Sequence, residues 1–323
     1  MTAAMKASPS LTNAMGIASI PLDELKKKYT DERSQFIEIN GLNIHYRVEG
    51  DGEPVVLVHG IVSSLQTWDD WATELRKSYK VISLDVPGYG LTGGPENEDD
   101  FNEEFLINTF AKFIDVLELD RINLAGNSLG GYISAQYASQ YPNRVKKLIL
   151  LDPVAYPQKT PWVMDFATLP GIKQMGKLVA PPLLVTANVE DTYGDPDRIQ
   201  EQHMARYVHM SQRPGAKTAY IKTFEMLKAR STQEVPMPFH SITAPTLLMW
   251  GGRDAWVPVE LSQRWQEDIA HALLKVYPTA GHMPMEEIPE ITVKDAMAFL
   301  NGDSIETTDY AAFANSKAAD HLN

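Results

Sequence analysis

The chain of 323 residues contains no cysteine. This absence excludes a disulfide framework, a zinc–thiolate site and a thiol nucleophile. It also fits a reducing compartment. The N-terminal segment carries a single lysine before several polar residues and shows no apolar stretch typical of a signal peptide. We therefore predict a cytoplasmic protein.

Long apolar runs and concentrated positive charge are also missing. No apolar run approaches the ~18–20 residues of a membrane-spanning helix, so we expect no stable insertion into a membrane. The chain has 29 Lys and Arg against 42 Asp and Glu, a formal net charge of −13, without a basic cluster that could bind phosphates. We expect no nucleic-acid partner. The sequence gives no indication of the oligomeric state.

Short apolar runs alternate with amphipathic helical patterns over the first half of the chain. Two alternating runs meet at Asn40-Gly41, a typical hairpin turn, and a buried run follows at 55–58. Further apolar runs at 79–88 and 146–153 are separated by helical patterns such as 101–119. This rhythm predicts an α/β fold with a mostly parallel sheet covered by helices on both faces.

Residues 153–240 interrupt this rhythm, which resumes after them. The interruption is rich in proline and glycine, has helical patterns at 197–211 and 216–230, and contains the apolar run PPLLVT as its one strand-like segment. The chain is therefore expected to comprise an N-terminal arm (1–34) with an exposed helical piece, an α/β core (35–152 and 241–302), a helical cap (153–240) and a loose polar C-terminal tail (303–323).

A serine between two glycines marks the junction of an apolar run and a helical pattern. In GNSLG, Ser128 lies two residues from both Gly126 and Gly130. A serine becomes a useful nucleophile only when a base takes its proton and the backbone presents its oxygen. A tight strand–turn–helix provides that presentation, and glycines two residues away relieve its crowding. The spacing predicts a nucleophile elbow at Ser128.

A base for this nucleophile is expected among the eight histidines. His282 follows an apolar strand and precedes the last helix of the core, which places it at the carboxyl edge of the sheet. A carboxylate must orient such an imidazole. Asp254 follows a strand end 28 residues earlier, and Asp152 ends another strand. We favour Asp254, because its strand should neighbour the one that leads to His282.

Two peptide N–H groups should stabilise the oxyanion that forms when Ser128 attacks a carbonyl. One belongs to Leu129, directly after the nucleophile. The other is expected from Ile61, after Gly60 in the loop that follows the first buried strand. We expect the neighbouring His59 to hold this loop in place by hydrogen bonds.

These segments together resemble the α/β-hydrolase superfamily. The resemblance covers residues 35 to 300 and rests on His59-Gly60, DVPGYGLT (85–92), GNSLGG (126–131), WGGRD (250–254) and GHMPMEE (281–287). It implies an eight-stranded, mostly parallel sheet with a helical cap inserted after the sixth strand. The serine nucleophile sets the chain apart from haloalkane dehalogenases and epoxide hydrolases of this layout, which use aspartate.

Three of the superfamily classes that share a Ser-His-Asp triad are candidates; cofactor-free perhydrolases share the triad too but usually lack so large a cap. Carboxylesterases and lipases acting on small to medium acyl chains form the first. Carbon–carbon hydrolases of ring-cleavage products form the second; they use a cap arginine for the substrate carboxylate, here Arg206 or Arg213. They tend to have a glycine-rich oxyanion loop and a tryptophan after the catalytic histidine, where this chain has Ile61-Val62 and Met283. Small-molecule receptors with slow turnover form the third.

The sequence leads to a serine esterase that needs no metal and no organic cofactor and acts on a small-molecule ester. The cap is expected to shape the acyl pocket. Candidate pocket residues are apolar cap side chains: Trp162, Phe166, Met204 and Met210. We expect Glu286 and Glu287 to begin the final helix, where acidic residues complement the helix dipole.

Overall fold

The computed structural model describes residues 15–320, with side chains to residue 316. An eight-stranded sheet runs through the molecule in the order β1-β2-β4-β3-β5-β6-β7-β8. Strand β2 pairs antiparallel with β1 and β4, and all other pairs are parallel. The strands are β1 (Ser34–Ile39), β2 (Leu42–Glu49), β3 (Glu53–Val58), β4 (Tyr79–Leu84), β5 (Ile122–Asn127), β6 (Val145–Leu151), β7 (Thr246–Gly251) and β8 (Leu273–Tyr277). The predicted α/β architecture is confirmed.

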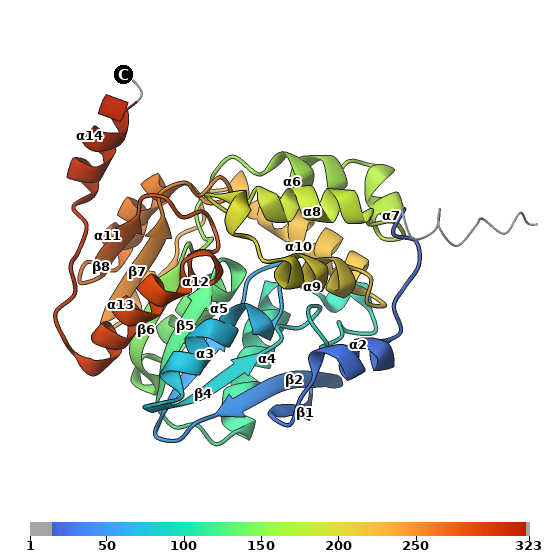
Figure 1. The fold of residues 1–323 in the computed structure, drawn as a ribbon, viewed down its shortest axis with the longest axis horizontal. Coiled ribbons are helices and arrows are strands. Elements are labelled where there is room, and N and C mark those ends of the chain that lie inside the picture. The colour runs from blue at the N-terminus through green and yellow to red at the C-terminus, as the bar shows by residue number, and fades with distance from the viewer. Residues whose placement is uncertain (1–14, 321–323) are drawn as a thin grey trace, which may run out of the picture.

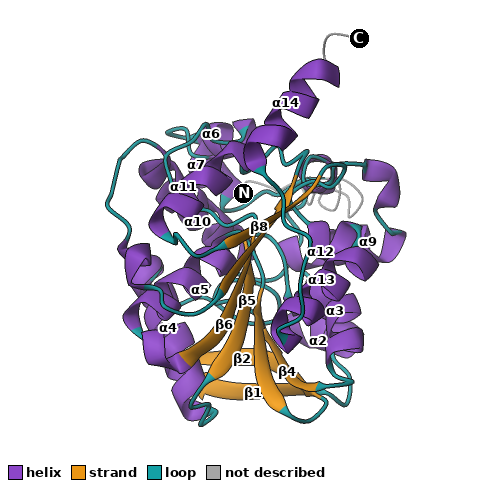
Figure 2. Ribbon diagram, turned by 90° about the vertical axis from the view of Figure 1, so that its left-hand side faces the viewer, coloured by secondary structure: helices purple, strands orange, loops and turns teal. Residues whose placement is uncertain are grey.

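Helices cover both faces of this sheet (Figure 2). One face carries α3 (Asp69–Leu75) and α13 (Pro289–Asn301), and the other carries α4 (Glu103–Val116), α5 (Leu129–Gln140) and α11 (Ser262–Asp268). The central strands are therefore buried on both sides, which is why their sequences are continuously apolar. Short 3₁₀ helices occupy connections at Leu65–Trp68, Glu98–Asp100, Pro142–Arg144, Pro196–Arg198, Pro238–Ser241 and Val259–Leu261.

A layer of helices lies over the carboxyl ends of the strands (Figure 1). It lies between β6 and β7 in the chain and consists of α6 (Trp162–Ala167), α7 (Ile172–Gly176), α8 (Pro182–Glu190), α9 (Glu201–Ser211) and α10 (Ala216–Ser231). The strand-like run PPLLVT is helical and opens α8, so that reading was wrong. Proline at the first helical position is favourable because its fixed φ suits the helix.

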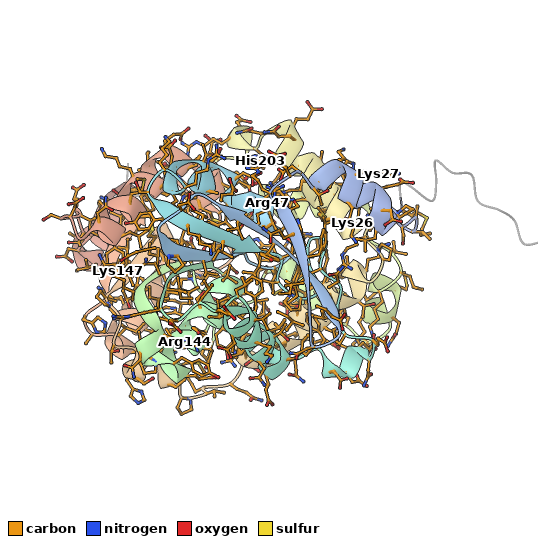
Figure 3. The ribbon with its side chains drawn as sticks, turned by 90° about the horizontal axis from the view of Figure 1, so that it is seen from below. Lys26, Lys27, Arg47, Arg144, Lys147 and His203 are labelled. Atoms are coloured by element: carbon orange, nitrogen blue, oxygen red, sulfur yellow. The ribbon has the colours of Figure 1, made fainter. Side chains whose placement is uncertain are left out.

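The N-terminal arm contains the predicted helix, α2 (Leu22–Tyr29), but this helix is docked on the core. Leu25 is buried against Leu91 and Met210. Arg47 of β2 donates a hydrogen bond to the Tyr29 carbonyl (3.2 Å), and Figure 3 shows Arg47 beside α2. Residues 1–14 of the arm lie outside the described part of the chain.

The tail is more ordered than its polar composition suggests. The peptide N–H of Thr308 bonds to the carbonyl of Leu274 (2.7 Å), and its hydroxyl accepts from the N–H of Val276 (2.9 Å). The helix α14 (Tyr310–Asp320) follows and extends from the body (Figure 1). The expectation of a loose tail was wrong because β8 is an edge strand, whose free peptide groups pair with this segment. No described helix is long and apolar enough to cross a bilayer.

Candidate active site

Ser128 occupies a sharp turn between β5 and α5. Its backbone has φ 54° and ψ −117°, a conformation that costs energy for any residue other than glycine. A Cβ atom on Gly126 would lie 2.3 Å from the carbonyl oxygen of Gly130, and one on Gly130 would lie 2.1 Å from that of Val58. Both glycines are therefore required, and the turn has the geometry expected of a nucleophile elbow.

His282 and Asp254 come together at the carboxyl edge of the sheet. Asp254 follows β7, and His282 follows β8 before the short helix α12 (Pro284–Glu287). The Nδ1 atom of His282 lies 2.7 Å from Oδ2 of Asp254, and both side chains are buried. Because Nδ1 donates to the carboxylate, Nε2 has a free lone pair; it is buried without a hydrogen-bond partner among the described residues. His282 and Ser128 line the same cavity.

Two peptide groups fix the carboxylate of Asp254. Its Oδ1 atom accepts hydrogen bonds from the N–H groups of Trp256 (2.7 Å) and Val257 (2.9 Å). The Trp256 ring also stacks on His282, with ring centroids 6.1 Å apart. These contacts hold the imidazole in one orientation and one tautomer, as a general base requires.

Asp152 lies beside this pair and has a different role. Its Oδ1 atom accepts from the N–H of Gly251 (2.8 Å), and the structure shows no hydrogen bond from it to His282. Burial and the neighbouring charge of Asp254 raise the pKa of Asp152 well above its usual value. Ligating atoms of Asp152, Asp254 and His282 lie within 4.8 Å of one another, the one such group among the described residues. Within this group the structure shows one hydrogen bond, between His282 and Asp254.

The expected oxyanion donors lie on both sides of Ser128. Neither the N–H of Ile61 nor that of Leu129 donates a hydrogen bond to a described residue. Gly60 brings the first loop against the nucleophile: a Cβ atom there would lie 3.0 Å from the Cβ of Ser128. Two free N–H groups beside a serine can stabilise a tetrahedral oxyanion.

His59 holds the oxyanion loop, as its position in the sequence suggested. Its Nδ1 atom donates to the carbonyl of Gly60 (2.7 Å), and Nε2 accepts from the N–H of Val86 (3.0 Å). Burial lowers the pKa of His59, which keeps the ring neutral for these two bonds.

A cavity of about 310 Å³ opens above Ser128 and extends between the cap helices α6, α7, α8 and α10. Of the four cap candidates, Phe166 lines it and Trp162 does not; the Trp162 side chain is 55% exposed. Met204 packs against the core, and Met210 is buried against α2. The two methionines were misplaced because composition does not reveal which face of α9 meets the core. The cavity instead uses Val185, Val189, Ile221 and Phe224, together with Lys217 and Tyr220.

A buried polar cluster joins the cap to the loop of His282. Glu286 binds Arg206 of α9 through both carboxylate oxygens (2.9 and 2.7 Å) and accepts from the hydroxyl of Tyr193 (2.9 Å). Burial alone would raise the pKa of Glu286, but Arg206 and the other partners outweigh it and lower the pKa. Glu287 accepts from the N–H groups of Gly194 (2.9 Å) and Gly281 (2.7 Å). The expectation that Glu286 and Glu287 begin the final helix and complement its dipole was wrong. Both residues lie at the end of α12, before α13, and their carboxylates bind the cap.

Comparison with known proteins agrees with this geometry. Residues 53–289 match the model of the family described as alpha/beta hydrolase fold. The chain belongs to this family. The family alone does not specify which bond is cleaved.

Several similar proteins are named hydrolases. The chain is 29% identical over 259 residues to 2-hydroxy-6-oxo-2,4-heptadienoate hydrolase of Pseudomonas putida, covering 78% of this chain and 90% of the relative. It is 30% identical over 257 residues to 2-hydroxy-6-oxononadienedioate/2-hydroxy-6-oxononatrienedioate hydrolase of Escherichia coli, covering 75% and 85%. Among solved structures, a bacterial membrane phospholipase A superimposes with a TM-score of 0.70 at 26% identity, covering 87% of this chain and 91% of that one.

Proposed function

We propose that the protein is a serine hydrolase that cleaves carboxylic esters of small to medium acyl chain through an acyl-enzyme. The observation that carries this proposal is the buried His282–Asp254 hydrogen bond at the edge of an apolar cavity whose wall includes Ser128. An apolar cavity with few polar groups suits an acyl chain. We keep the cytoplasmic location, the small-molecule ester partner, the absence of a nucleic-acid partner and the absence of a metal or cofactor as predictions.

The reaction follows from the positions of these groups. Nε2 of His282 takes the hydroxyl proton as the oxygen of Ser128 attacks the ester carbonyl, and the N–H groups of Ile61 and Leu129 bind the resulting oxyanion. His282 then gives that proton to the leaving alcohol, and the acyl group stays on Ser128. Water, deprotonated by His282, attacks the acyl-enzyme and releases the acid. Asp254 stabilises the imidazolium at each step.

Cleavage of a carbon–carbon bond is the second candidate, because two relatives are named as hydrolases of 6-oxo-dienoates. We expected a carbon–carbon hydrolase to bind the substrate carboxylate through an arginine of the cap. Neither Arg206 nor Arg213 lines the cavity. Arg206 is bound to Glu286, and Arg213 donates to the carbonyls of Pro214 and Gly88 (both 2.6 Å). These contacts leave neither candidate arginine available for a substrate carboxylate.

Initial rates with p-nitrophenyl esters of increasing acyl length test the proposal, with Ser128→Ala as the control. We expect turnover of the wild-type protein and a loss of about 10³-fold or more in the variant. A parallel assay with 2-hydroxy-6-oxo-2,4-heptadienoate measures the alternative. Faster consumption of this compound than of every ester would replace the esterase by the carbon–carbon hydrolase. Negligible turnover of every ester and of the dienoate by the folded protein would favour a small-molecule receptor with slow turnover.

A further inference from the structure

Lys217 is a cation in the wall of an otherwise apolar cavity. It is the second residue of α10, is only 7% exposed, and lines the cavity that contains Ser128. Its ammonium group forms no hydrogen bond and no ion pair with a described residue. The other lysines of the helix that have partners, Lys222 and Lys228, each pair with an aspartate near the surface.

The position of Lys217 is unfavourable for a charged side chain. Removing an ammonium group from water costs free energy unless a counter-charge replaces the lost hydration. The first turn of a helix also repels cations, because the peptide dipoles leave partial positive charge there. Burial lowers the pKa of Lys217, as expected for a cation without a partner. A methionine of similar length would pack at this site without the costs of desolvation and of dipole repulsion. A bound anion would offset both costs for the lysine.

The polar residues that neighbour Lys217 in the chain provide no acidic partner. Tyr220 lies one helical turn further on, lines the same cavity, and its buried hydroxyl has no partner among the described residues. Arg213, just before the helix, is 5% exposed and pairs with no described carboxylate. Asp85 acts on Arg213 only over a distance, because its oxygens bind His45 (2.7 Å) and the N–H of Leu91 (2.7 Å). Lys217 and Tyr220 thus line the cavity without an acidic partner in the described part of the chain, and Arg213 interacts electrostatically with Tyr220.

We propose that Lys217 and Tyr220 form an anion-binding subsite that takes an oxyanionic group, a carboxylate or a phosphate, carried by an apolar substrate or by its acid product. This proposal rests on the proposed function for the identity of the reaction, but the subsite itself does not depend on turnover. The ammonium and the phenol donate hydrogen bonds to the anion, and Arg213 adds positive potential behind them. The protein would therefore select esters with a negative group some distance from the cleaved bond.

Equilibrium binding to the wild-type protein tests the subsite without any reaction. The probes are octanoate, octyl phosphate and octanol, which share one chain and differ in the head group. We expect an anionic probe to bind at least about tenfold more tightly than octanol. Lys217→Met should abolish this preference, while Lys217→Arg should keep most of it. Lys228→Met, on the same helix but away from the cavity, is the matched control and should behave as the wild type.

The comparison of probes has distinct outcomes. Tighter binding of octanoate identifies a carboxylate, and tighter binding of octyl phosphate identifies a phosphate; either supports the subsite. Equal affinities for octanol and both anions, or an anion preference that survives in Lys217→Met, would overturn it. Anion binding in a protein that hydrolyses no ester would refute the proposed function and keep the subsite. Ester turnover without an anion preference would refute the subsite alone.

Discussion

Asp152 and Asp254 are two aspartates at neighbouring strand ends that the structure distinguishes. Asp254 receives two peptide N–H groups and the imidazole, so its charge is well solvated by donors. Asp152 receives one peptide N–H and faces Asp254, His282, Tyr277 and Glu287 from the surrounding elements. Burial and the charge of Asp254 raise the pKa of Asp152, so the folded protein favours the protonated form of this carboxyl more than an exposed site would.

Replacing each aspartate by asparagine should separate these roles. Asp254→Asn removes the acceptor that sets the histidine tautomer, and we expect kcat to fall by about 10³–10⁴-fold. Asp152 makes no hydrogen bond to His282, and asparagine keeps its shape and the acceptor for the Gly251 N–H, so Asp152→Asn should leave kcat/KM within about threefold of wild type. Rates of ester hydrolysis between pH 5 and 9 measure both effects. If Asp152 were ionised instead, its asparagine variant would shift the acid limb of the profile to lower pH.

The raised pKa of Asp152 also has a consequence for stability. In the unfolded chain the carboxyl of Asp152 ionises once the pH exceeds its ordinary pKa of 3.8. In the folded protein its pKa is higher, so it ionises only at higher pH. Stability is therefore lost as the pH rises from that value toward the folded pKa. Asp152→Asn removes this loss, so its Tm should exceed that of the wild type at pH 7 and approach it at pH 4. Thermal unfolding across this range is the measurement, and a Tm below that of wild type at pH 7 would contradict the argument.

Much of the site could be predicted from local sequence, because its chemistry depends on short motifs. The glycines around Ser128 are needed by backbone sterics within a few residues. Asp254 and His282 follow strand ends, which parallel topology brings to one edge. Lys217 could not be found in this way. A lysine in the first turn of a helix is ordinary until the packing of α10 shows that this residue is only 7% exposed and lines the cavity.

The short helix α12 links the catalytic loop to the cap. Its Glu286 lies four residues after His282 and binds Arg206 of α9, while the hydroxyl of Thr67 from the core donates to the same carboxylate. Cap and core thus meet at a buried charge pair beside the general base. Such a pair contributes little compared with apolar packing, but removing one partner leaves an uncompensated charge.

Breaking this pair should destabilise the protein strongly. We expect Glu286→Gln to lower the free energy of unfolding by about 3–5 kcal/mol, because Arg206 stays buried without its counter-charge. The double variant Arg206→Met/Glu286→Gln should lose less than the sum of the single changes. Denaturant unfolding at pH 7 measures these values. Folding lowers the pKa of Glu286. The pair therefore stabilises the fold fully above about pH 4.5, and this stabilisation is lost as the pH falls through the pKa of the folded protein.

A matched control for this prediction is Glu234→Gln, which removes the exposed partner of Arg264. That surface pair should contribute no measurable stability. Equal stability of Glu286→Gln and wild type would show that the buried pair is not required.

The sequence revealed neither of these ion pairs, and it did not reveal the ordered part of the tail. Contacts between distant segments depend on which edges and faces the fold leaves open.

The relation between cap and core determines what the enzyme can bind. The core supplies Ser128, His282 and the oxyanion donors, and the cap supplies most of the apolar wall. The sequence predicted an insertion with helical patterns, because proline and glycine interrupt the β/α rhythm there. It did not predict which cap side chains face the cavity, since α8 and α10 have weak amphipathic patterns and turn different faces to the core, the cavity and solvent.

Narrowing the cavity should change the preferred acyl length without changing the chemistry. Val189 of α8 is 4% exposed and lines the cavity, whereas Leu183 of the same helix is 78% exposed and does not. We expect Val189→Phe to lower kcat/KM for p-nitrophenyl octanoate by about tenfold or more, since a pocket discriminates by 1–3 kcal/mol per methylene lost. The acetate ester should stay within about threefold of wild type, because its short acyl group fills little of the cavity. Leu183→Phe should leave both rates unchanged. An equal fall for both esters in Val189→Phe would mean that the substitution disturbs the catalytic groups and that the acyl chain binds elsewhere.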